Sequence, residues 1–302
     1  MKQQAMTLLQ FQQRFSNEES CYDYLFKMKW PEGFICPRCG QKEYYQTTTR
    51  KHPLYECKSC RHQTTVTVGT IFEKTRTPLL KWFWAIYLSA HDKRGVSANF
   101  ISKEIEVSYW VAWLMLQKIR EAMGERDNNY LLNGIVEVDE SFFGAPTEGG
   151  RRGRGTEKAM VFVELSLNQK GHPQYMKMTV IDNMKKETVI DKIKKTVVTK
   201  SEIRSDAYPS YQALSKEGYR HFSAPCDLKS NPDHLGWIHT IISNAKAFIG
   251  GTLHGLDSKH LQRYLNEFCY RFNRRMFQGE GFNRLLFSCL TTKTITYSEL
   301  TQ

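Results

Sequence analysis

Two pairs of cysteines near the N-terminus constrain the fold more than any other feature of the chain. Cys36 and Cys39 form one C-x-x-C pair, Cys57 and Cys60 form a second, and seventeen residues separate the pairs. This spacing is typical of a zinc ribbon, in which each C-x-x-C turn presents two thiolates to one ion. The alternative is two redox dithiols, but the repeated spacing favours zinc. Because four thiolates complete a tetrahedral sphere, we predict one structural zinc ion.

The chain is basic and long enough for two or three domains. It has 302 residues, of which 40% are hydrophobic, and its 43 Lys and Arg against 31 Asp and Glu give a formal net charge of +12. Such a charge favours a polyanionic partner, although charge alone does not distinguish nucleic acid from a membrane surface. No apolar run reaches the roughly 18 residues of a membrane span, and no signal peptide is recognisable. We therefore expect a cytoplasmic protein without a membrane partner.

Helical periodicity surrounds the ribbon. Residues 1–30 predict one or two short amphipathic helices, and the ribbon is assigned to residues 31–75, with a strand from Gln63 to Val68. Residues 76–129 predict a helix from Pro78, a short helix after Ser97 and a longer one from Tyr109 to Met123, which is the layout of a helix-turn-helix. Arg120 adds charge for DNA; the alternative is a core helix of a small bundle. The polar residues 124–129 predict a linker.

The segment from Gly134 to Gly144 predicts a core strand that carries three carboxylates, on Glu137, Asp139 and Glu140. Burying a carboxylate is costly unless a cation lies beside it. The strand therefore either carries a metal-binding Asp139 or is an edge strand with a solvated acidic face. Strand alternation places Glu137 and Asp139 on one face.

The remaining pattern completes a second domain, residues 130–302, with the element order βββαβαβα. A second aspartate, Asp206, ends the fourth strand. This order resembles the ribonuclease-H-like fold, and we predict a multi-domain α+β protein with this fold at its C-terminus. The resemblance implies that the first and fourth strands are neighbours, so that Asp139 and Asp206 share two Mg²⁺ or Mn²⁺ ions. On the following helix, His239 and Lys246 lie seven residues apart on one face; Asn244 is the alternative to His239 as third ligand.

Two groups of arginines are candidates for contact with the DNA backbone. A glycine-rich loop, residues 144–155, is one, and the end of a helix that spans residues 259–275 is the other. We predict exposed side chains at both, although cations at a helix C-terminus also interact favourably with the helix dipole. The candidates are Arg151, Arg152 and Arg154 in the loop and Arg271, Arg274 and Arg275 at the helix end. Cys21, Cys226, Cys269 and Cys289 lack ligand spacing and are predicted to be reduced packing residues.

Together these motifs resemble the zinc-ribbon DDE transposases of insertion sequences, in the family numbered fifteen ninety-five with an ISXO-type catalytic domain. The matching segments are Trp30 to Gly40, Cys57 to Cys60, Gly69 to Phe72, Val138 to Gly144, Ser205 to Tyr211 and His260 to Arg275.

The resemblance implies binding of terminal inverted repeats, metal-dependent cleavage and strand transfer, and a homodimer or larger assembly. It assigns Asp139 and Asp206 to the two Asp positions and Lys246 to the Lys of the last catalytic helix. His239 stands where such sites have Glu. The alternatives are a zinc-ribbon regulator with an inactive second domain and a structure-specific nuclease.

Overall fold

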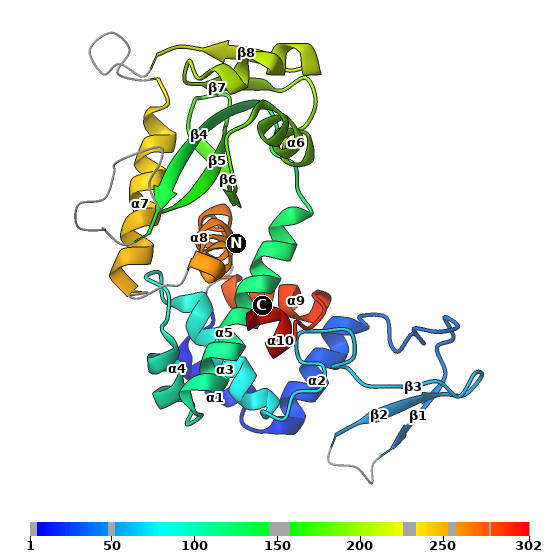
Figure 1. Ribbon diagram of the computed structural model, residues 1–302. Coiled ribbons are helices and arrows are strands. Elements are labelled where there is room, and N and C mark those ends of the chain that lie inside the picture. The colour runs from blue at the N-terminus through cyan, green and yellow to red at the C-terminus, as the bar shows by residue number, and fades with distance from the viewer. Residues whose placement is uncertain are drawn as a thin grey trace. The chain divides into compact units, whose positions relative to one another are not determined.

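The computed structural model describes residues 5–47, 52–144, 158–225, 234–252, 258–277 and 279–301. The chain forms two compact units: one combines Met1–Met123 with Phe277–Gln302, and the other is Gly124–Met276 (Figure 1). These units differ from the predicted domain boundaries, because residues 277–302 pack with the N-terminal part of the chain. Among the described helices, none combines the length and the hydropathy that crossing a membrane requires.

The ribbon is a three-stranded antiparallel sheet. Its strands are β1 (Tyr44–Thr47), β2 (Leu54–Cys57) and β3 (Gln63–Thr64). The predicted strand from Gln63 to Val68 is therefore too long by four residues. After Thr64 the backbone turns, and the ammonium of Lys29 donates hydrogen bonds to the carbonyls of Val66 (2.9 Å) and Val68 (2.6 Å). These carbonyls bond a side chain and do not extend the ladder of hydrogen bonds.

Aromatic packing explains why the C-terminal residues join the first unit. Phe282 lies within 6 Å, ring centroid to centroid, of Phe11, Phe15 and Phe83. Burial of these large rings is a major source of stability. The helices of this unit, two of them in the predicted N-terminal segment, are α1 (Leu8–Arg14), α2 (Glu18–Lys29), α3 (Leu79–His91), α4 (Ala98–Glu104), the first part of α5 (Tyr109–Asn128), α9 (Gly281–Thr291) and α10 (Tyr297–Thr301).

Helices α4 and α5 have the order and the short connection that the sequence predicts for a helix-turn-helix. Arg120, however, is only 2% exposed, and its guanidinium donates to the carbonyl of Val96 at 3.4 Å. A side chain so enclosed does not reach a DNA phosphate in this conformation. The prediction that Arg120 contacts DNA is therefore corrected to a structural role.

The predicted linker at residues 124–129 is instead the last turn of α5. Asp127 holds this turn: its carboxylate accepts from Arg274 (2.6 Å) and Asn273 (2.9 Å), and its carbonyl accepts from Lys177 (2.9 Å). Gly124 packs so closely against Asn266 that an added Cβ would displace the Asn266 side chain. Asp127 and Gly124, whose residue types are typical of a loop, thus make tertiary contacts within the second unit.

The second unit contains a five-stranded sheet with the strand order β6-β5-β4-β7-β8. The first three strands form an antiparallel meander, whereas β7 runs parallel to both β4 and β8. This is the ribonuclease-H-like arrangement, and the predicted order βββαβαβα is confirmed, with a 3₁₀ helix in its second helical position. The strands are β4 (Ile135–Phe143), β5 (Ala159–Leu167), β6 (Pro173–Ile181), β7 (Glu202–Ser205) and β8 (Arg220–Ser223).

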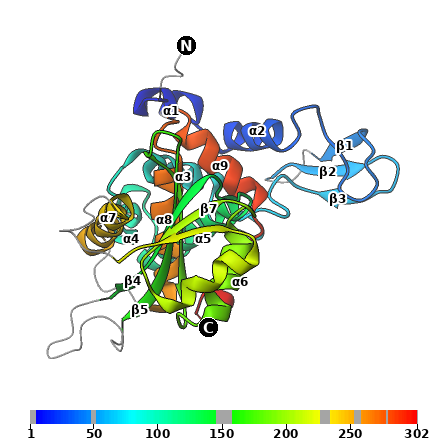
Figure 2. The same ribbon diagram turned by 90° about the horizontal axis from the view of Figure 1, so that it is seen from above.

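Helices cover both faces of this sheet, and α6 and α7 lie on opposite sides of it in Figure 2. Alternate residues of β4 serve the two faces: Phe143 packs with α7 and α8, and Val136 and Val138 pack with α6. Glu137 and Asp139 therefore lie on the α7 face, as alternation predicts. The helical elements are α6 (Lys186–Thr196), η1 (Pro209–Glu217), α7 (Gly236–Thr252), η2 (Ser258–His260) and α8 (Leu261–Asn273).

The arginines at the end of α8 have partners inside the second unit. Arg271 binds Glu267 at 2.7 Å, Arg274 binds Asp127, and the guanidinium of Arg275 donates to three carbonyls, among them that of Gln174 at 3.0 Å. The side chains of Arg271 and Arg274 are only 16% and 14% exposed. The prediction that these arginines are exposed for DNA is therefore wrong. Their planar donors instead connect α8 to α5 and β6.

Buried Glu164 gives the second unit a predictable response to pH. Its carboxylate accepts from Thr196, and burial raises the pKa of Glu164 to about 7. A carboxyl with a raised pKa is protonated more in the folded than in the unfolded chain, so stability falls as pH rises from about 4.5 through 7. Glu164→Gln keeps an acceptor for Thr196 and is expected to reduce the pH-dependent decrease in the free energy of unfolding by up to about 3 kcal/mol. Thermal unfolding of both proteins at pH 5 and pH 8 measures this decrease.

The matched control is Glu187→Gln, the same chemical change on an exposed residue of α6. That variant should follow the wild-type pH dependence. An equal stability loss between pH 5 and pH 8 in Glu164→Gln and in wild type would contradict the assignment of this dependence to Glu164.

Candidate active site

Strand register brings the two predicted aspartates together. β4 and β7 run parallel with Glu137 opposite Arg204. Asp139 is two residues after Glu137, and Asp206, which follows the end of β7, is two residues after Arg204. The parallel register therefore places the two aspartates side by side. The ligand oxygens of Asp139, Asp206 and Glu140 all lie within 4.8 Å of one another. Three carboxylates at this separation repel one another unless a cation or a proton is present, so the group is suited to a divalent ion.

Backbone amides fix the orientation of both aspartates. Asp139 accepts through Oδ1 from the amide of Glu140 at 2.9 Å, and Asp206 accepts through Oδ1 from the amide of Tyr208 at 3.1 Å. The second oxygen of Asp139 lies 3.2 Å from Nε2 of His239. Hard carboxylate oxygens with one imidazole are donors that suit Mg²⁺ and Mn²⁺.

Helix α7 brings His239 and Lys246 alongside β4. His239 lies beside Asp139, and Nζ of Lys246 lies 5.6 Å from the ring centre of Phe143. His239 and Lys246 are about 10.5 Å apart along the helix, and their neighbours Asp139 and Phe143 are about 13 Å apart along the strand. Because the earlier residue of each pair contacts the earlier residue of the other, α7 runs in the same direction as β4. His239 and the alternative candidate Asn244 are both exposed, so the 3.2 Å contact of His239 with Asp139 is what distinguishes them. The geometry therefore associates His239 with the carboxylates.

The pKa values of the two basic residues near the carboxylates shift in opposite directions. The hydrogen bond to Asp139 raises the pKa of His239, and the charges of Asp139, Glu137 and Asp206 add to this effect. Burial lowers the pKa of Lys246, and neighbouring Lys158 lowers it further. The imidazole is thus drawn toward the protonated form by the carboxylates. A metal ion bound to Nε2 would compete with that proton.

Glu140 is the residue of the carboxylate group that the sequence did not identify as a site residue. Alternation places it on the face opposite Asp139, where the hydroxyl of Tyr211 approaches its Oε2 at 3.5 Å. β7 pairs only with residues 135–137 of β4, so the edge of β4 beyond Glu137 is open on that side. At such an open edge, carboxylates on opposite faces of the strand can approach the same point. The Asp139-Glu140 pair in the sequence could have indicated that Glu140 belongs to the site, but strand alternation predicts that neighbouring side chains point to opposite faces.

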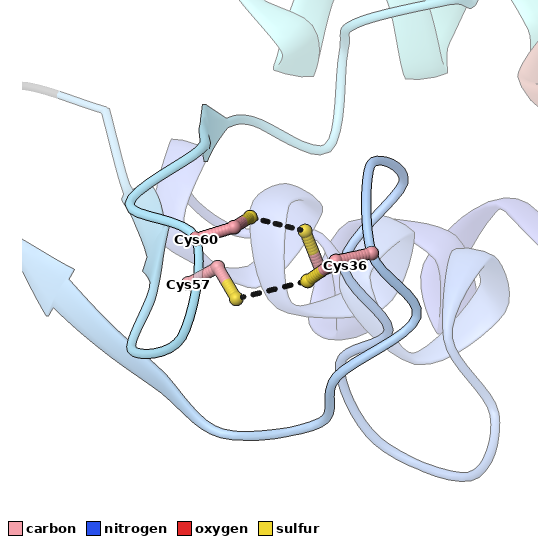
Figure 3. A group of neighbouring side chains, drawn as sticks. Cys36, Cys57 and Cys60 are labelled. Carbon is pink, nitrogen blue, oxygen red and sulfur yellow. Dashed lines mark hydrogen bonds between the residues drawn. The ribbon is translucent and has the colours of Figure 1, made fainter.

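The four predicted zinc ligands also converge. Cys36 Sγ lies 3.6 Å from Cys60 Sγ, and Cys39 Sγ lies 3.6 Å from Cys57 Sγ (Figure 3). All four sulfur atoms lie within 4.8 Å of one another. Zinc–sulfur bonds of about 2.3 Å in a tetrahedron separate the sulfurs by about 3.8 Å. The donor set therefore fits one closed, structural zinc site.

The remaining predicted DNA contacts cannot be placed relative to the site. Arg151, Arg152 and Arg154 lie outside the described residues, as does Cys226. Cys21, Cys269 and Cys289 are buried free thiols, as predicted.

Comparison with known families now identifies the chain. A model described as an ISXO2-like transposase domain matches residues 131–273, and a model described as a transposase zinc-ribbon domain matches residues 16–63. The first contains the carboxylate group, and the second contains all four cysteines. The two domains of IS1595 transposases thus match residues 16–63 and 131–273 of this chain. The resemblance inferred from its motifs is thereby confirmed.

A curated relative is described as an uncharacterized protein in transposable element ISH50 of Halobacterium salinarum. It is 29% identical over 165 residues, which is 49% of this chain and 55% of the relative. The chain thus spans about half the length of the curated relative it matches.

Similar solved structures include the catalytic core domain of BIV integrase, with a TM-score of 0.31 and 13% identity over 45% of this chain and 81% of that one. Another is the Mos1 mariner paired end complex with Mn, with a TM-score of 0.31 and 12% identity over 68% of this chain and 76% of that one. The likeness to the IS1595 family rests on the two model matches.

Proposed function

We propose that the protein binds the terminal inverted repeats of an insertion sequence, cleaves DNA at the element ends and joins the 3′ ends to a target. The observation that carries the proposal is the convergence of Asp139, Asp206 and Glu140 within a transposase-family domain. Family membership supports a DNA-acting enzyme.

The site residues divide the chemistry among them. Asp139, Asp206 and His239 would hold two Mg²⁺ or Mn²⁺ ions, with Glu140 as a further oxygen donor. Bound ions would supply Lewis-acid stabilisation of charge on the reacting phosphate. The amide contacts to Asp139 and Asp206 keep their carboxylates oriented, and Lys246 would contact a DNA phosphate beyond the carboxylates. Such a reaction requires no covalent bond between protein and DNA.

Binding to double-stranded DNA is assigned to the N-terminal unit. Its zinc ribbon and the helices α4 and α5 supply the elements that commonly contact DNA. The net charge of +12 favours association with phosphate. Because two element ends are cut in one event, we propose a homodimer or a larger assembly. Because the proposed substrate is DNA, we also propose that the protein acts in the cytoplasm.

A strand-transfer assay tests the proposal and the role of His239 together. Purified protein is incubated with the element's own end DNA, a supercoiled target and Mg²⁺ or Mn²⁺, and joined products are quantified. Wild type is expected to join ends that carry the repeats and not scrambled ends. His239→Ala should lower joining by at least the roughly 10- to 100-fold that loss of an outer-shell partner of a metal site causes, because His239 is itself a proposed ligand. Asn244→Ala, a matched change on the same helix, should stay within a few fold of wild type.

Three other outcomes have distinct meanings. Binding of the ends without cleavage in either metal would replace the proposal with a DNA-binding regulator. Cleavage of branched DNA that ignores the repeats would replace it with a structure-specific nuclease. A large loss in Asn244→Ala with none in His239→Ala would assign the third ligand to Asn244.

A further inference from the structure

We infer that Glu137 is a positioning residue, which tethers the first turn of α7 to β4 and thereby holds His239 at Asp139. The inference rests on the proposed function, because His239 matters there as a metal ligand. It concerns a residue two positions before Asp139 on the same face of the same strand. Two neighbouring contacts would then connect β4 to α7: Glu137 with the amide of Ile238, and Asp139 with the imidazole of His239.

The contact itself is buried and well formed. Glu137 is 3% exposed, and its Oε2 accepts from the backbone amide of Ile238 at 3.1 Å. Ile238 is the third residue of α7, so its amide has no partner within the helix. A carboxylate at a helix N-terminus is favoured by that amide and by the helix dipole. Glu137 therefore meets the bonding requirement of a helix end that is buried against the sheet.

Other contacts anchor the same end of α7. Nε2 of His234 lies 3.0 Å from the carbonyl of Ser205, the last residue of β7. Leu235 is 1% exposed and has a φ of 58°, a left-handed conformation that is uncommon for a leucine. A buried side chain in such a conformation persists only where its surroundings fix it. The start of α7 is thus held from two strands that each lead to one of the aspartates.

The tether acts on His239 because the two residues are joined through Ile238. His239 directly follows the residue that Glu137 binds, and its amide donates to the carbonyl of Leu235 at 3.2 Å. Its imidazole then lies 3.2 Å from Asp139. A movement of the first turn away from β4 would carry the imidazole away from the carboxylates. Loss of Glu137 should consequently weaken the metal site without removing any ligand.

A double-mutant cycle between Glu137 and His239 separates positioning from a general structural role. The variants are Glu137→Ala, Glu137→Gln, His239→Ala and the double variant Glu137→Ala with His239→Ala. Affinity for Mn²⁺ is measured by electron paramagnetic resonance without DNA. Hydrogen exchange of residues 236–241 is measured on the metal-free protein. Glu164→Gln, with and without His239→Ala, is the matched control, because Glu164 is a buried carboxylate on the opposite face of the sheet.

Glu137→Ala is expected to weaken Mn²⁺ binding about tenfold, as loss of an outer-shell partner typically does, and to speed exchange at residues 236–241 alone. Glu137→Gln keeps an acceptor oxygen and should lose less. In the His239→Ala background, Glu137→Ala should cost little more, since the residue it positions is gone. Glu164→Gln should leave Mn²⁺ affinity within twofold of wild type, in either background.

Two results would overturn the inference. One is a Glu137→Ala effect on Mn²⁺ affinity that is equally large with and without His239. The other is unchanged exchange at residues 236–241. If wild type binds no Mn²⁺, the proposed function fails, and the exchange data alone decide whether Glu137 tethers α7.

Discussion

Asp139→Asn should reduce DNA cleavage and strand transfer by about 10³-fold or more while leaving end binding within a few fold of wild type. The change preserves the size of the side chain and removes the charge that a divalent ion requires. Loss of several kcal/mol of stabilisation in the transition state corresponds to that factor, at about 1.4 kcal/mol for each tenfold change in rate. End binding is assigned to the other unit of the chain and does not use this carboxylate. Gel-based cleavage and filter binding on the same preparations measure the two quantities.

Asp191→Asn provides the matched control for this change. Asp191 lies on α6 with its side chain 63% exposed and pairs with Lys195 at 2.8 Å. Its replacement should leave cleavage and end binding as in wild type. Two results would count against the proposed division of labour: cleavage by Asp139→Asn at a near wild-type rate, or loss of end binding together with cleavage.

Removal of zinc should unfold the ribbon and leave the ribonuclease-H-like domain folded. Binding of structural zinc contributes about 10 to 16 kcal/mol in zinc-finger peptides. A three-stranded sheet of only ten residues is not expected to be stable without such a contribution. Cys57→Ala should therefore lose the metal, and residues 36–64 should exchange their amide hydrogens rapidly while β4 and β5 stay protected. Wild type should contain one zinc ion per chain by atomic absorption.

Cys289→Ala serves as the control, because Cys289 is a buried thiol of the same unit that has no part in the zinc site. It should keep one zinc ion per chain and a protected ribbon. Slow exchange at residues 36–64 in Cys57→Ala, after metal removal by a chelator, would show that the ribbon folds without zinc. The assignment of a structural metal would then be lost.

Most of the secondary structure of the second unit could be predicted from its sequence. The β4 strand has apolar residues on both sides of its acidic positions, and two bounding glycines mark its limits. The order of strands and helices then matched the ribonuclease-H-like arrangement. Errors arose where tertiary contacts decide local structure. Lys29 ends β3 early, and Asp127 with Gly124 converts an expected linker into helix, because their partners lie far away in the sequence.

Charge was the least reliable guide. Arg120, Arg271 and Arg274 are basic residues in a basic protein, yet each is buried or paired within the fold. Composition fixes the net charge but not its distribution, because a guanidinium can bond equally well to a phosphate or to a carboxylate of its own chain. Only the packing of α8 against α5 and β6 decides between these partners.

The amino-acid sequence by itself predicted the four cysteines of the ribbon, the two aspartates and the family. The cysteines could be recognised because they lie at a short spacing that the local backbone preserves, and the aspartates because the order of strands and helices was readable. The tertiary structure decided how separate segments combine. The parallel register of β4 and β7 puts Asp139 level with Asp206, and the open edge beyond Glu137 admits Glu140. The direction of α7 along β4 places His239 beside Asp139. Such distances depend on strand pairing and helix packing between residues up to 100 positions apart along the chain, which periodicity and spacing do not encode.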